Sequence, residues 1–257
     1  MITHKVFEDL VGLLYLMKRT KNQSFQFKQF IVKQDRTAMK VCTEACILGS
    51  YVTVSEANKI LDIGTGTGLL ALMLAQRATK NAIIHAVEID QEAFEQAQEN
   101  IQNSPFASKI QVFHQAIQGF ASHCAEQYDL IVSNPPFYQQ HLRSANSKRN
   151  QALHAQTLTF SELSSAVTQL LAPTGTFVVL LPVFETQQLT ELLSKQNLFP
   201  QQQLVIKNQA DGGIFRLITA FGFKEKTIKS SELFIRDKTS EYSNEFVALL
   251  KDYYLIF

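Results

Sequence analysis

The sequence predicts an α/β fold in which helices cover both faces of a largely parallel β-sheet, with one antiparallel strand at the sheet edge. Two observations support this prediction. Apolar segments rich in β-branched residues alternate with longer helix-like segments, which is typical of parallel strands joined by crossover helices. The last two strand-like segments are separated only by residues 208–215, and this connection is too short for a parallel crossover. The last strand should therefore run antiparallel to its neighbour.

The predicted elements follow one another along a single domain, residues 25–257. Residues 24–32 read as a short strand and residues 43–52 as a helix, before the alternation begins. The strands expected in the sheet are 59–62, 82–88, 111–114, 128–133, 177–181, 204–207 and 216–223. The helices expected among them are 69–77, 91–103, 160–171 and 185–194. Strands that are buried on both faces of a parallel sheet read as continuous apolar runs, as most of these strands do.

Residues 1–24 form a separate unit, which we predict to be an amphipathic helix. One face of this helix carries the apolar side chains of Val6, Phe7, Leu10, Val11, Leu14 and Met17. Glu8 and Asp9 interrupt the apolar pattern and no small-residue cleavage site follows, so the segment does not resemble a signal peptide. The sequence leaves open whether the apolar face docks on the main domain or on a second subunit.

The composition excludes few functions. A net charge of +1 over 257 residues neither demands nor excludes a nucleic-acid partner. The three cysteines cannot all pair and form no C-x-x-C motif, so we predict a reducing compartment, the cytoplasm. No stretch of about 18 uncharged apolar residues predicts a membrane span. The six histidines lack the spacing of metal ligands, and we predict no metal site.

The stretch LDIGTGTG, residues 61–68, follows a predicted strand and precedes a predicted helix. Ligands of open α/β sheets bind at the carboxyl ends of the strands, where glycines let the backbone approach the ligand closely. The last glycine of the dinucleotide-binding fingerprint is replaced here by Leu69, and Asp62 would repel a pyrophosphate. Asp62 suits a cationic cofactor, with Gly64 and Gly66 beside it. The alternative is a plain tight turn.

Glu88 ends the second strand of the alternation, where a carboxylate can accept both hydroxyls of a ribose. Dinucleotide sites and S-adenosylmethionine sites both use this device, so Glu88 does not discriminate between them. The pattern D-x-G-x-G-x-G that starts at Asp62, however, resembles motif I of the S-adenosylmethionine-dependent methyltransferases. This resemblance implies the Rossmann-like sheet of the class I methyltransferases, whose antiparallel strand distinguishes it from the dehydrogenase sheet.

A second motif, SNPPF, follows the strand at 128–133. It resembles the (D/N/S)-P-P-(Y/F/W) motif of methyltransferases that modify planar amino groups in adenine, cytosine or a glutamine amide. The lone pair of such an amine is delocalised, and acceptors placed on both N–H bonds favour a more tetrahedral nitrogen. The expected acceptors are the side-chain oxygen of Asn134 and the carbonyl of Pro135, which the prolines hold rigidly. Phe137 and Tyr138 offer rings on which a flipped base can stack. The alternative is an ordinary proline loop.

Longer blocks carry a more specific resemblance. These blocks are residues 25–52, 60–77, 98–100 and 133–140, with the C-terminal segments LFIRD, EYSNEF and YYLIF. Together they resemble the bacterial tRNA1(Val) adenine-N6 methyltransferase family over residues 25–257. The resemblance implies S-adenosylmethionine as cofactor, a folded tRNA as substrate, and methylation at N6 of adenosine 37, immediately 3′ of the anticodon. It assigns site roles to Lys40, Thr43, Glu44, Asp62, Gly64, Gly66, Glu88, Asn134, Pro135 and Phe137.

The chain departs from this family pattern at three places. Residues 1–24 have no counterpart. Cys42 and Glu44 stand where the family usually has a glycine and an aspartate. Ala116 occupies the position at which related enzymes carry an aspartate that binds the cofactor adenine. At this edge of the cofactor we therefore expect an amide oxygen, from Gln115 or Gln118, to take the place of the missing carboxylate.

Basic residues cluster on both sides of the predicted cofactor site in the sequence. Residues 1–40 carry a net charge of +5, residues 56–129 carry −5, and residues 130–161 contain three basic residues and no acidic residue. Phosphate contacts need such a local footprint and not a basic whole chain. The candidate RNA contacts are Lys28, Lys33, Arg36, Phe137, Tyr138, Arg143, Lys148 and Arg149.

Three alternative functions stay open at this point. They are N5 methylation of a protein glutamine, N6 methylation of an adenine in another RNA or in DNA, and a binding module without turnover. The basic N-terminal block favours RNA over a protein substrate. The intact pair Asn134 and Pro135 argues against a module without turnover.

Overall fold

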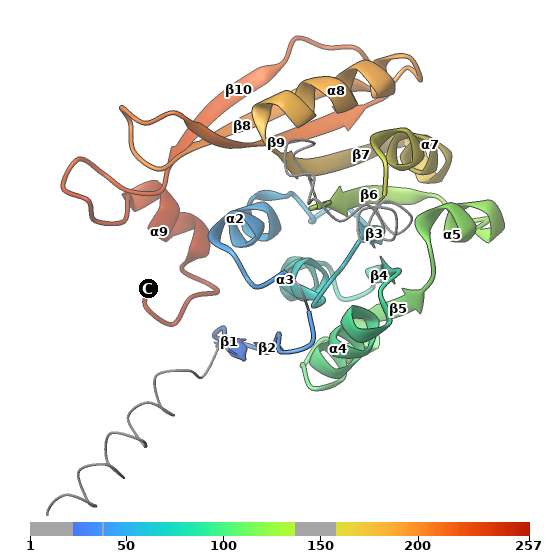
Figure 1. Ribbon diagram of the computed structural model, residues 1–257, viewed down its shortest axis with the longest axis horizontal. Coiled ribbons are helices and arrows are strands. Elements are labelled where there is room, and N and C mark those ends of the chain that lie inside the picture. Colours follow the sequence, from blue (N-terminus) through green and yellow to red (C-terminus); the bar gives the residue numbers. More distant parts are fainter. Residues whose placement is uncertain (1–22, 38, 137–157) are drawn as a thin grey trace, which may run out of the picture.

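The computed structural model describes residues 23–37, 39–136 and 158–257. Its centre is an eight-stranded sheet with the strand order β10-β8-β9-β7-β6-β3-β4-β5 (Figure 1). The strands of this sheet are β3 (Lys59–Ile63), β4 (Ile83–Glu88), β5 (Ile110–His114), β6 (Tyr128–Ser133), β7 (Leu171–Leu181), β8 (Phe199–Lys207), β9 (Ile214–Gly222) and β10 (Lys229–Phe234). Each strand predicted for the sheet is confirmed, although several are longer than predicted.

Helices pack on both faces of the sheet, as predicted. One apolar core lies between the sheet and α2 (Thr43–Tyr51), α3 (Leu69–Arg77), α4 (Gln91–Gln102) and α9 (Asn244–Leu250). A second core lies on the other face, under α5 (Ile117–His123), α7 (Phe160–Leu170) and α8 (Val183–Ser194). The fold is therefore a three-layer α/β sandwich of the Rossmann-like type. None of the described helices is long and apolar enough to cross a membrane.

One feature of the predicted sheet is wrong. The antiparallel strand exists, since β9 runs antiparallel to both β7 and β8, but it is not at the edge. It lies between these two strands, and β10 continues the sheet beyond β8 in the parallel direction. The sequence did not indicate β10, because its exposed residues Ser230, Ser231 and Glu232 are polar and it pairs on one side only, within the described sheet.

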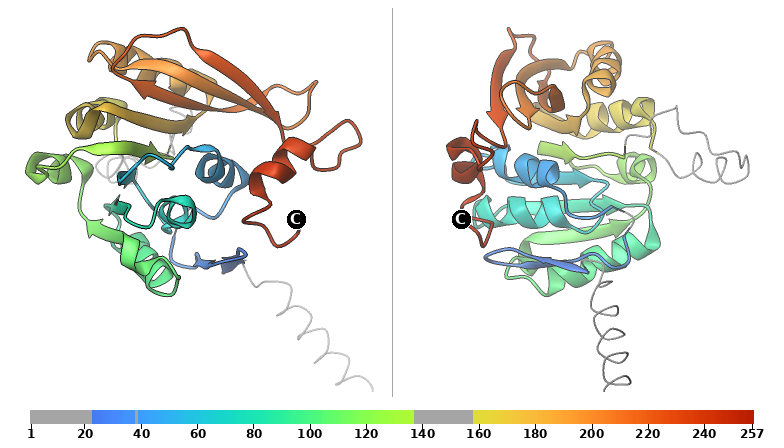
Figure 2. Two further views of the ribbon diagram at one scale, coloured as in Figure 1. Left: turned by 180° about the vertical axis from the view of Figure 1, so that it is seen from behind. Right: turned by 60° about the vertical axis from the view of Figure 1, so that its left-hand side comes forward.

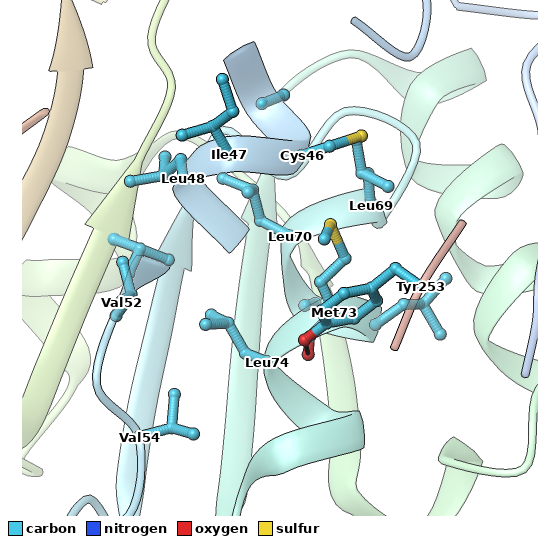
Figure 3. Packing of buried hydrophobic residues seen from close by; sticks show 14 of the residues in the cluster. Cys46, Ile47, Leu48, Val52, Val54, Leu69, Leu70, Met73, Leu74 and Tyr253 are labelled. Carbon is cyan, nitrogen blue, oxygen red and sulfur yellow. Dashed lines mark hydrogen bonds between the residues drawn. The ribbon is translucent and has the colours of Figure 1, made fainter. Parts of the chain in front are cut away.

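The packing of α2 on α3 forms the centre of the first core (Figure 3). Gly49 allows this close approach, because a Cβ atom at that position would lie 2.7 Å from the sulfur of Met73. Tyr253, near the C-terminus, covers the same region: its hydroxyl donates to the carbonyl of Met73 at 2.9 Å. The Arg77 side chain in turn donates to the Tyr253 hydroxyl at 2.8 Å. The C-terminal segment is thereby held against α3.

The N-terminal segment of the described chain is a hairpin and not the single strand predicted for residues 24–32. Strands β1 (Ser24–Gln26) and β2 (Ile31–Lys33) pair antiparallel, and Phe27 closes the turn by donating its N–H to the carbonyl of Phe30 at 2.9 Å. The Phe27 and Phe30 rings stack at 4.6 Å. Figure 2 shows this hairpin at the opposite end of the molecule from α8. The predicted helix at residues 1–24 falls almost wholly outside the described residues.

Candidate active site

The candidate site lies where the order of strands in the sheet reverses direction. Strand β3 has β4 on one side and β6 on the other, which is the switch point at which open α/β sheets bind ligands. In register, Ile63 pairs with Val87 of β4 and with Ser133 of β6. The next residues along these three strands are Gly64, Glu88 and Asn134, so the fold brings the two sequence motifs and the acidic strand end to one edge.

The glycine loop after β3 adopts a conformation that other residues rarely tolerate. The φ angles of Gly64, Gly66 and Gly68 are +72°, +57° and +81°, in the left-handed region that costs an L-residue about 1–2 kcal/mol. The N–H groups of Gly64 and Thr65 donate to the Val87 carbonyl at 2.9 and 3.1 Å. A Cβ atom at Gly64 or Gly66 would meet nothing within 4 Å. The loop therefore leaves open space beside its backbone, as a cradle for a ligand requires.

Asp62 is fully buried below this loop and is only partly satisfied. Its Oδ2 accepts a hydrogen bond from the Thr65 hydroxyl at 2.6 Å, whereas no hydrogen bond of normal geometry reaches Oδ1. Burial raises the pKa of the Asp62 carboxyl to about 7; the hydrogen bonds of Thr65 and of the Ala71 N–H oppose this rise, and the charge of Glu88 adds to it. A buried carboxylate oxygen without a partner is costly. The ammonium group of a cationic cofactor, directly or through water, would supply that partner.

Glu88 is held in a single orientation by backbone donors. Its Oε1 accepts from the N–H groups of Ile89 and Asp90, both at 2.9 Å, and its Oε2 accepts from the N–H of Gly66 at 2.8 Å. Because a carboxylate oxygen can accept two hydrogen bonds, Oε2 retains capacity for a ribose hydroxyl. The link to Gly66 also couples the carboxylate directly to the glycine loop. These features fit S-adenosylmethionine: an acid for the ammonium group, an acid for the ribose, and an open glycine cradle between them.

Asn134 and Pro135 stand at the end of β6, at the same edge. The Ser133 hydroxyl donates to the carbonyl of Ile63 at 2.9 Å and fixes the end of β6 against β3. Asn134 is half-buried and Pro135 is buried. The amide nitrogen of Asn134 lies 3.9 Å from the sulfur of Met39. The other predicted members of the motif, Phe137 and Tyr138, lie outside the described residues.

The segment before α2 contacts this edge through Met39. The amine of Lys40 does not point to an open ligand site, because it donates to the carbonyls of Gln34 and Thr37. Thr43 is the first residue of α2, and the carboxylate of Glu44 lies 3.9 Å from the guanidinium of Arg216 on β9. Lys40 therefore fixes its own loop, and a direct contact between Lys40 and the cofactor stays a prediction.

Residues 115–118, which we predicted to bind the cofactor adenine, follow β5 at the same edge of the sheet. Gln115 follows β5, and its N–H donates to the carbonyl of Glu88 at 3.0 Å. Ala116 precedes the first turn of α5 and offers no polar atom on its side chain. Gln118 is exposed and hydrogen-bonds to Glu162 of α7. Of the two glutamines proposed as substitutes for the missing aspartate, Gln115 thus lies directly beside the end of β4 that carries Glu88.

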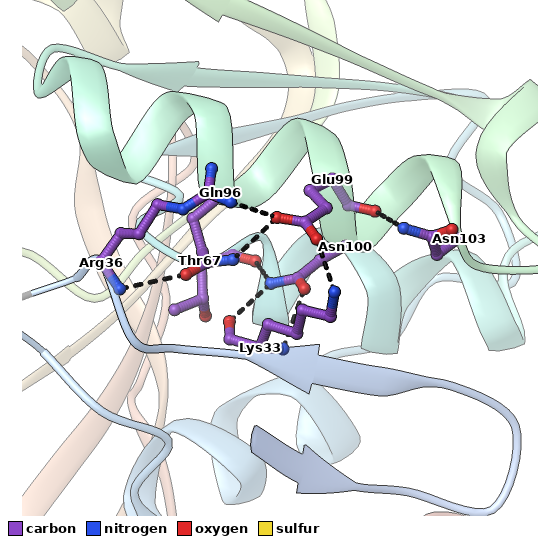
Figure 4. A network of polar contacts seen from close by, with 7 residues as sticks. All are labelled: Lys33, Arg36, Thr67, Gln96, Glu99, Asn100 and Asn103. Atoms are coloured by element: carbon purple, nitrogen blue, oxygen red, sulfur yellow. Dashed lines mark hydrogen bonds and ion pairs between the residues drawn. The ribbon is translucent and has the colours of Figure 1, made fainter. Parts of the chain in front are cut away.

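The predicted RNA contacts that the structure describes are engaged with other parts of the protein. Lys28 donates from its amine to the carbonyls of Lys251 and Phe257. Lys33 and Arg36 both form ion pairs with Glu99 of α4, at 2.6 and 2.8 Å (Figure 4). Their side chains remain 52% and 43% exposed, so they stay accessible from solvent. Arg143, Lys148 and Arg149 lie outside the described residues.

Two buried amides of α4 that we did not predict hold neighbouring segments, and one of them, Asn100, supports the glycine loop from behind. Asn100 of α4 donates to the carbonyls of Lys33 at 2.8 Å and of Thr67 at 2.9 Å (Figure 4). Its oxygen accepts from the Lys33 N–H at 2.8 Å. Gln96, also fully buried, accepts from the N–H of Arg36 at 3.1 Å. The signal in the sequence was present, because these polar residues lie on the same face of the predicted helix as Ala93 and Ala97.

The described residues contain no group of three or more His, Cys, Asp or Glu side chains that could hold a metal ion. Cys46 is buried and Cys42 partly buried, and burial raises the pKa of both thiols. Their role in this part of the chain is therefore packing.

Comparisons with known proteins agree with this geometry. Residues 40–180 match the model of the methyltransferase small domain family. The chain is 46% identical over 241 residues to a protein of Dyadobacter fermentans, covering 92% of this chain and 99% of the relative. It is 41% identical over 237 residues to a protein of Histophilus somni, again covering 92% and 99%. A relative in Bacteroides fragilis is 40% identical over 232 residues, covering 90% and 97%. All three relatives carry the name tRNA1(Val) (adenine(37)-N6)-methyltransferase.

Solved structures agree on the fold. A predicted O-methyltransferase of Agrobacterium tumefaciens superposes with a TM-score of 0.60 at 18% identity, over 81% of this chain and 95% of that one. A ribosomal protein L11 methylase of Lactobacillus delbrueckii gives 0.53 at 16% identity, over 76% and 84%. At such low identity these matches bear on the fold alone. With its relatives matched almost end to end, the chain belongs to the tRNA1(Val) (adenine(37)-N6)-methyltransferase family.

Proposed function

We propose that this protein transfers the methyl group of S-adenosylmethionine to N6 of adenosine 37 in tRNA1(Val). One observation carries the proposal: Asn134 and Pro135 follow β6 at the register position of Gly64 and Glu88, so an amine-binding motif adjoins a cofactor cradle. The names of relatives at 40–46% identity point to the same reaction. A tRNA substrate also places the reaction in the cytoplasm.

The residues of the cradle have separate roles in this proposal. S-adenosylmethionine supplies an electrophilic methyl group when bound. Asp62 faces the ammonium end, Oε2 of Glu88 accepts from a ribose hydroxyl, and the Gly64–Gly66 backbone approaches the cofactor closely. Gln115 replaces the missing aspartate beside the cofactor adenine. The charge of Asp62 suits this ligand, because its carboxylate attracts a cation and would repel the pyrophosphate of a dinucleotide.

The residues after β6 prepare the amine. The side-chain oxygen of Asn134 accepts one N–H bond of the adenine amino group, and the Pro135 carbonyl accepts the other. With both protons held, the nitrogen becomes more tetrahedral and its lone pair points at the methyl group. The sulfonium of the cofactor is already a good electrophile. Alignment of this kind therefore supplies most of the rate acceleration, and no strong general base is needed. Phe137 and Tyr138 would stack on the flipped base.

The RNA contacts complete the proposal. Arg143, Lys148 and Arg149 follow the NPPF motif closely in sequence and would bind the phosphates around the flipped adenosine. Lys33 and Arg36 stay exposed beside α4, where Glu99 holds them in place, and would bind phosphates further from the target base. Lys28 is the weakest of these candidates, because its amine is directed at main-chain carbonyls of the C-terminal segment.

The test uses labelled S-adenosylmethionine with total tRNA from a strain that lacks the enzyme. We expect label in tRNA, and N6-methyladenosine in its digest by nucleoside mass spectrometry. Purified tRNA1(Val) with guanosine at position 37 is the matched control and should accept no label. Label in a glutamine side chain of a co-incubated protein, with none in tRNA, would overturn the proposal in favour of the protein substrate. Calorimetry that detects binding of NAD but not of S-adenosylmethionine would overturn the cofactor assignment.

A further inference from the structure

The loop before α2 is held by a set of hydrogen bonds that end next to Asn134. Gln34 is buried, and its side-chain oxygen accepts from the N–H of Val41 at 2.7 Å. The amine of Lys40 donates to the carbonyls of Gln34 and Thr37. The Thr37 hydroxyl donates to the carbonyl of Met39 at 3.0 Å. These hydrogen bonds hold Thr37, Lys40 and Val41 and reach the carbonyl of Met39, although Met39 itself is 47% exposed.

Packing does not explain why an exposed methionine lies beside Asn134, the residue proposed to bind the target amine. The two apolar cores of the described residues are built from other side chains. Met39 belongs to neither core, and the sulfur at the end of its side chain lies 3.9 Å from the amide nitrogen of Asn134. This contact joins two segments that are 95 positions apart in the sequence.

The chemistry of the thioether decides what this contact can do. A carboxamide has two orientations, related by a half-turn, which exchange its oxygen and its NH₂ group. The thioether sulfur is a weak acceptor and has no proton to donate, so it can pair only with the NH₂ group. It therefore favours the orientation of Asn134 in which Oδ1 points away from Met39. Only this oxygen can accept an N–H bond of a target amine.

We propose that Met39 is a positioning residue for methyl transfer, which fixes the Asn134 carboxamide with its oxygen directed at the substrate amine. This inference rests on the proposed function, because it assigns Asn134 Oδ1 to the adenine amino group. A sulfur serves this purpose better than a second amide, which could pair with either end of Asn134 and hold it in the wrong orientation. The anchoring of the loop by Lys40 and Thr37 then acquires a function, since it holds the sulfur in place.

The experiment compares the rates of single-turnover methyl transfer by four proteins: the wild type, Met39→Leu, Asn134→Ala and the double variant. Each protein is in excess over the tRNA, and S-adenosylmethionine is saturating. Leucine keeps the volume and apolarity of Met39 and removes only the acceptor. We expect Met39→Leu to slow transfer by about 2- to 5-fold, the range for a weak hydrogen bond. Its affinity for S-adenosylmethionine and its melting temperature should equal those of the wild type.

The transfer rate of the double variant distinguishes a role of Met39 through Asn134 from a purely structural role of Met39. If Met39 acts through Asn134, the double variant should be as slow as Asn134→Ala alone, because the effects of coupled residues do not add. Met73→Leu, the same substitution within α3, is the control and should transfer at the wild-type rate. Wild-type transfer by Met39→Leu, or a double variant slower than Asn134→Ala by the full Met39→Leu factor, would overturn the inference alone. A wild type that methylates no tRNA would overturn the proposed function as well.

Discussion

The two halves of the candidate site differ in how completely the protein builds them. In the cofactor half, around β3 and β4, backbone donors orient Glu88, three left-handed glycines shape the loop, and Asn100 supports that loop from α4. In the substrate half, after β6, the amide nitrogen of Asn134 faces the sulfur of Met39 at 3.9 Å. The comparison indicates that the cofactor half is already shaped by hydrogen bonds of the protein, and we propose that RNA contacts complete the substrate half.

The largest expected effect tests the substrate half. Asn134→Ala removes the acceptor for the target amine and should slow single-turnover methyl transfer by about 100-fold or more, as loss of a preorganised hydrogen-bonding group does. Calorimetry should find its affinity for S-adenosylmethionine unchanged, because the cofactor half is built without this side chain. A variant that transfers methyl groups at the wild-type rate would remove Asn134 from the mechanism.

The second prediction concerns the RNA that completes the substrate half. The triple variant Arg143→Ala, Lys148→Ala and Arg149→Ala should flatten the log–log salt dependence of tRNA binding by about two to three, since each phosphate contact contributes about 0.7–0.9. Affinity for S-adenosylmethionine should not change. Lys80→Ala, which neutralises an exposed lysine after α3, is the control with an unaltered slope. An unaltered slope in the triple variant would place the RNA elsewhere.

The sequence indicated the cofactor half better than the substrate half, for a physical reason. Glycines at positive φ and acids at strand ends depend on local backbone geometry, so Asp62, Gly64, Gly66 and Glu88 could be recognised as a pattern along the chain. The sulfur contact of Met39 depends on the packing of a distant loop, which no local pattern encodes. Polar edge strands have the same difficulty, and β10 was missed because most of its residues are exposed and polar and show no apolar pattern.

The third prediction tests how far the cofactor half is preformed. Gly66→Ala places a Cβ atom in the open space of the cradle and should weaken S-adenosylmethionine binding by about tenfold, with a loss of stability of about 1–2 kcal/mol from its positive φ. Gly68→Ala is a matched control: φ is also positive, but its Cβ would contact Ile101 and Ala97 at 3.4 and 3.5 Å. It should lose stability to a similar extent and retain more of its cofactor affinity. Equal losses of affinity in the two variants would contradict the cradle.

The last prediction concerns the protonation of Asp62, a group of the cofactor half that the fold leaves partly unsatisfied. Its pKa in the free protein is raised to about 7 by burial, whereas a cationic ligand binds its ionised form. S-adenosylmethionine affinity should therefore rise with pH up to about 7 and then level off, with a limiting slope of about tenfold per unit below that value. Calorimetry across this range measures the slope, and Asp62→Asn should abolish it while it lowers the affinity at pH 8.

The contribution of Asp62 to the free energy of unfolding should fall as pH rises, whereas the affinity for S-adenosylmethionine should rise. These opposite trends distinguish the protonation of Asp62 from a general effect of acid on the protein. Because the folded-state pKa of Asp62 lies above the value of 3.8 for an unperturbed carboxyl, the folded protein holds a proton that the unfolded chain releases. The contribution of Asp62 to the free energy of unfolding should therefore be greatest below pH 3.8 and fall as the pH rises to about 7. The difference in unfolding free energy between the wild type and Asp62→Asn, measured by denaturant titration, isolates this contribution. If that difference is the same at pH 5 and pH 8, Asp62 is ionised throughout, and its partner is already supplied by the protein.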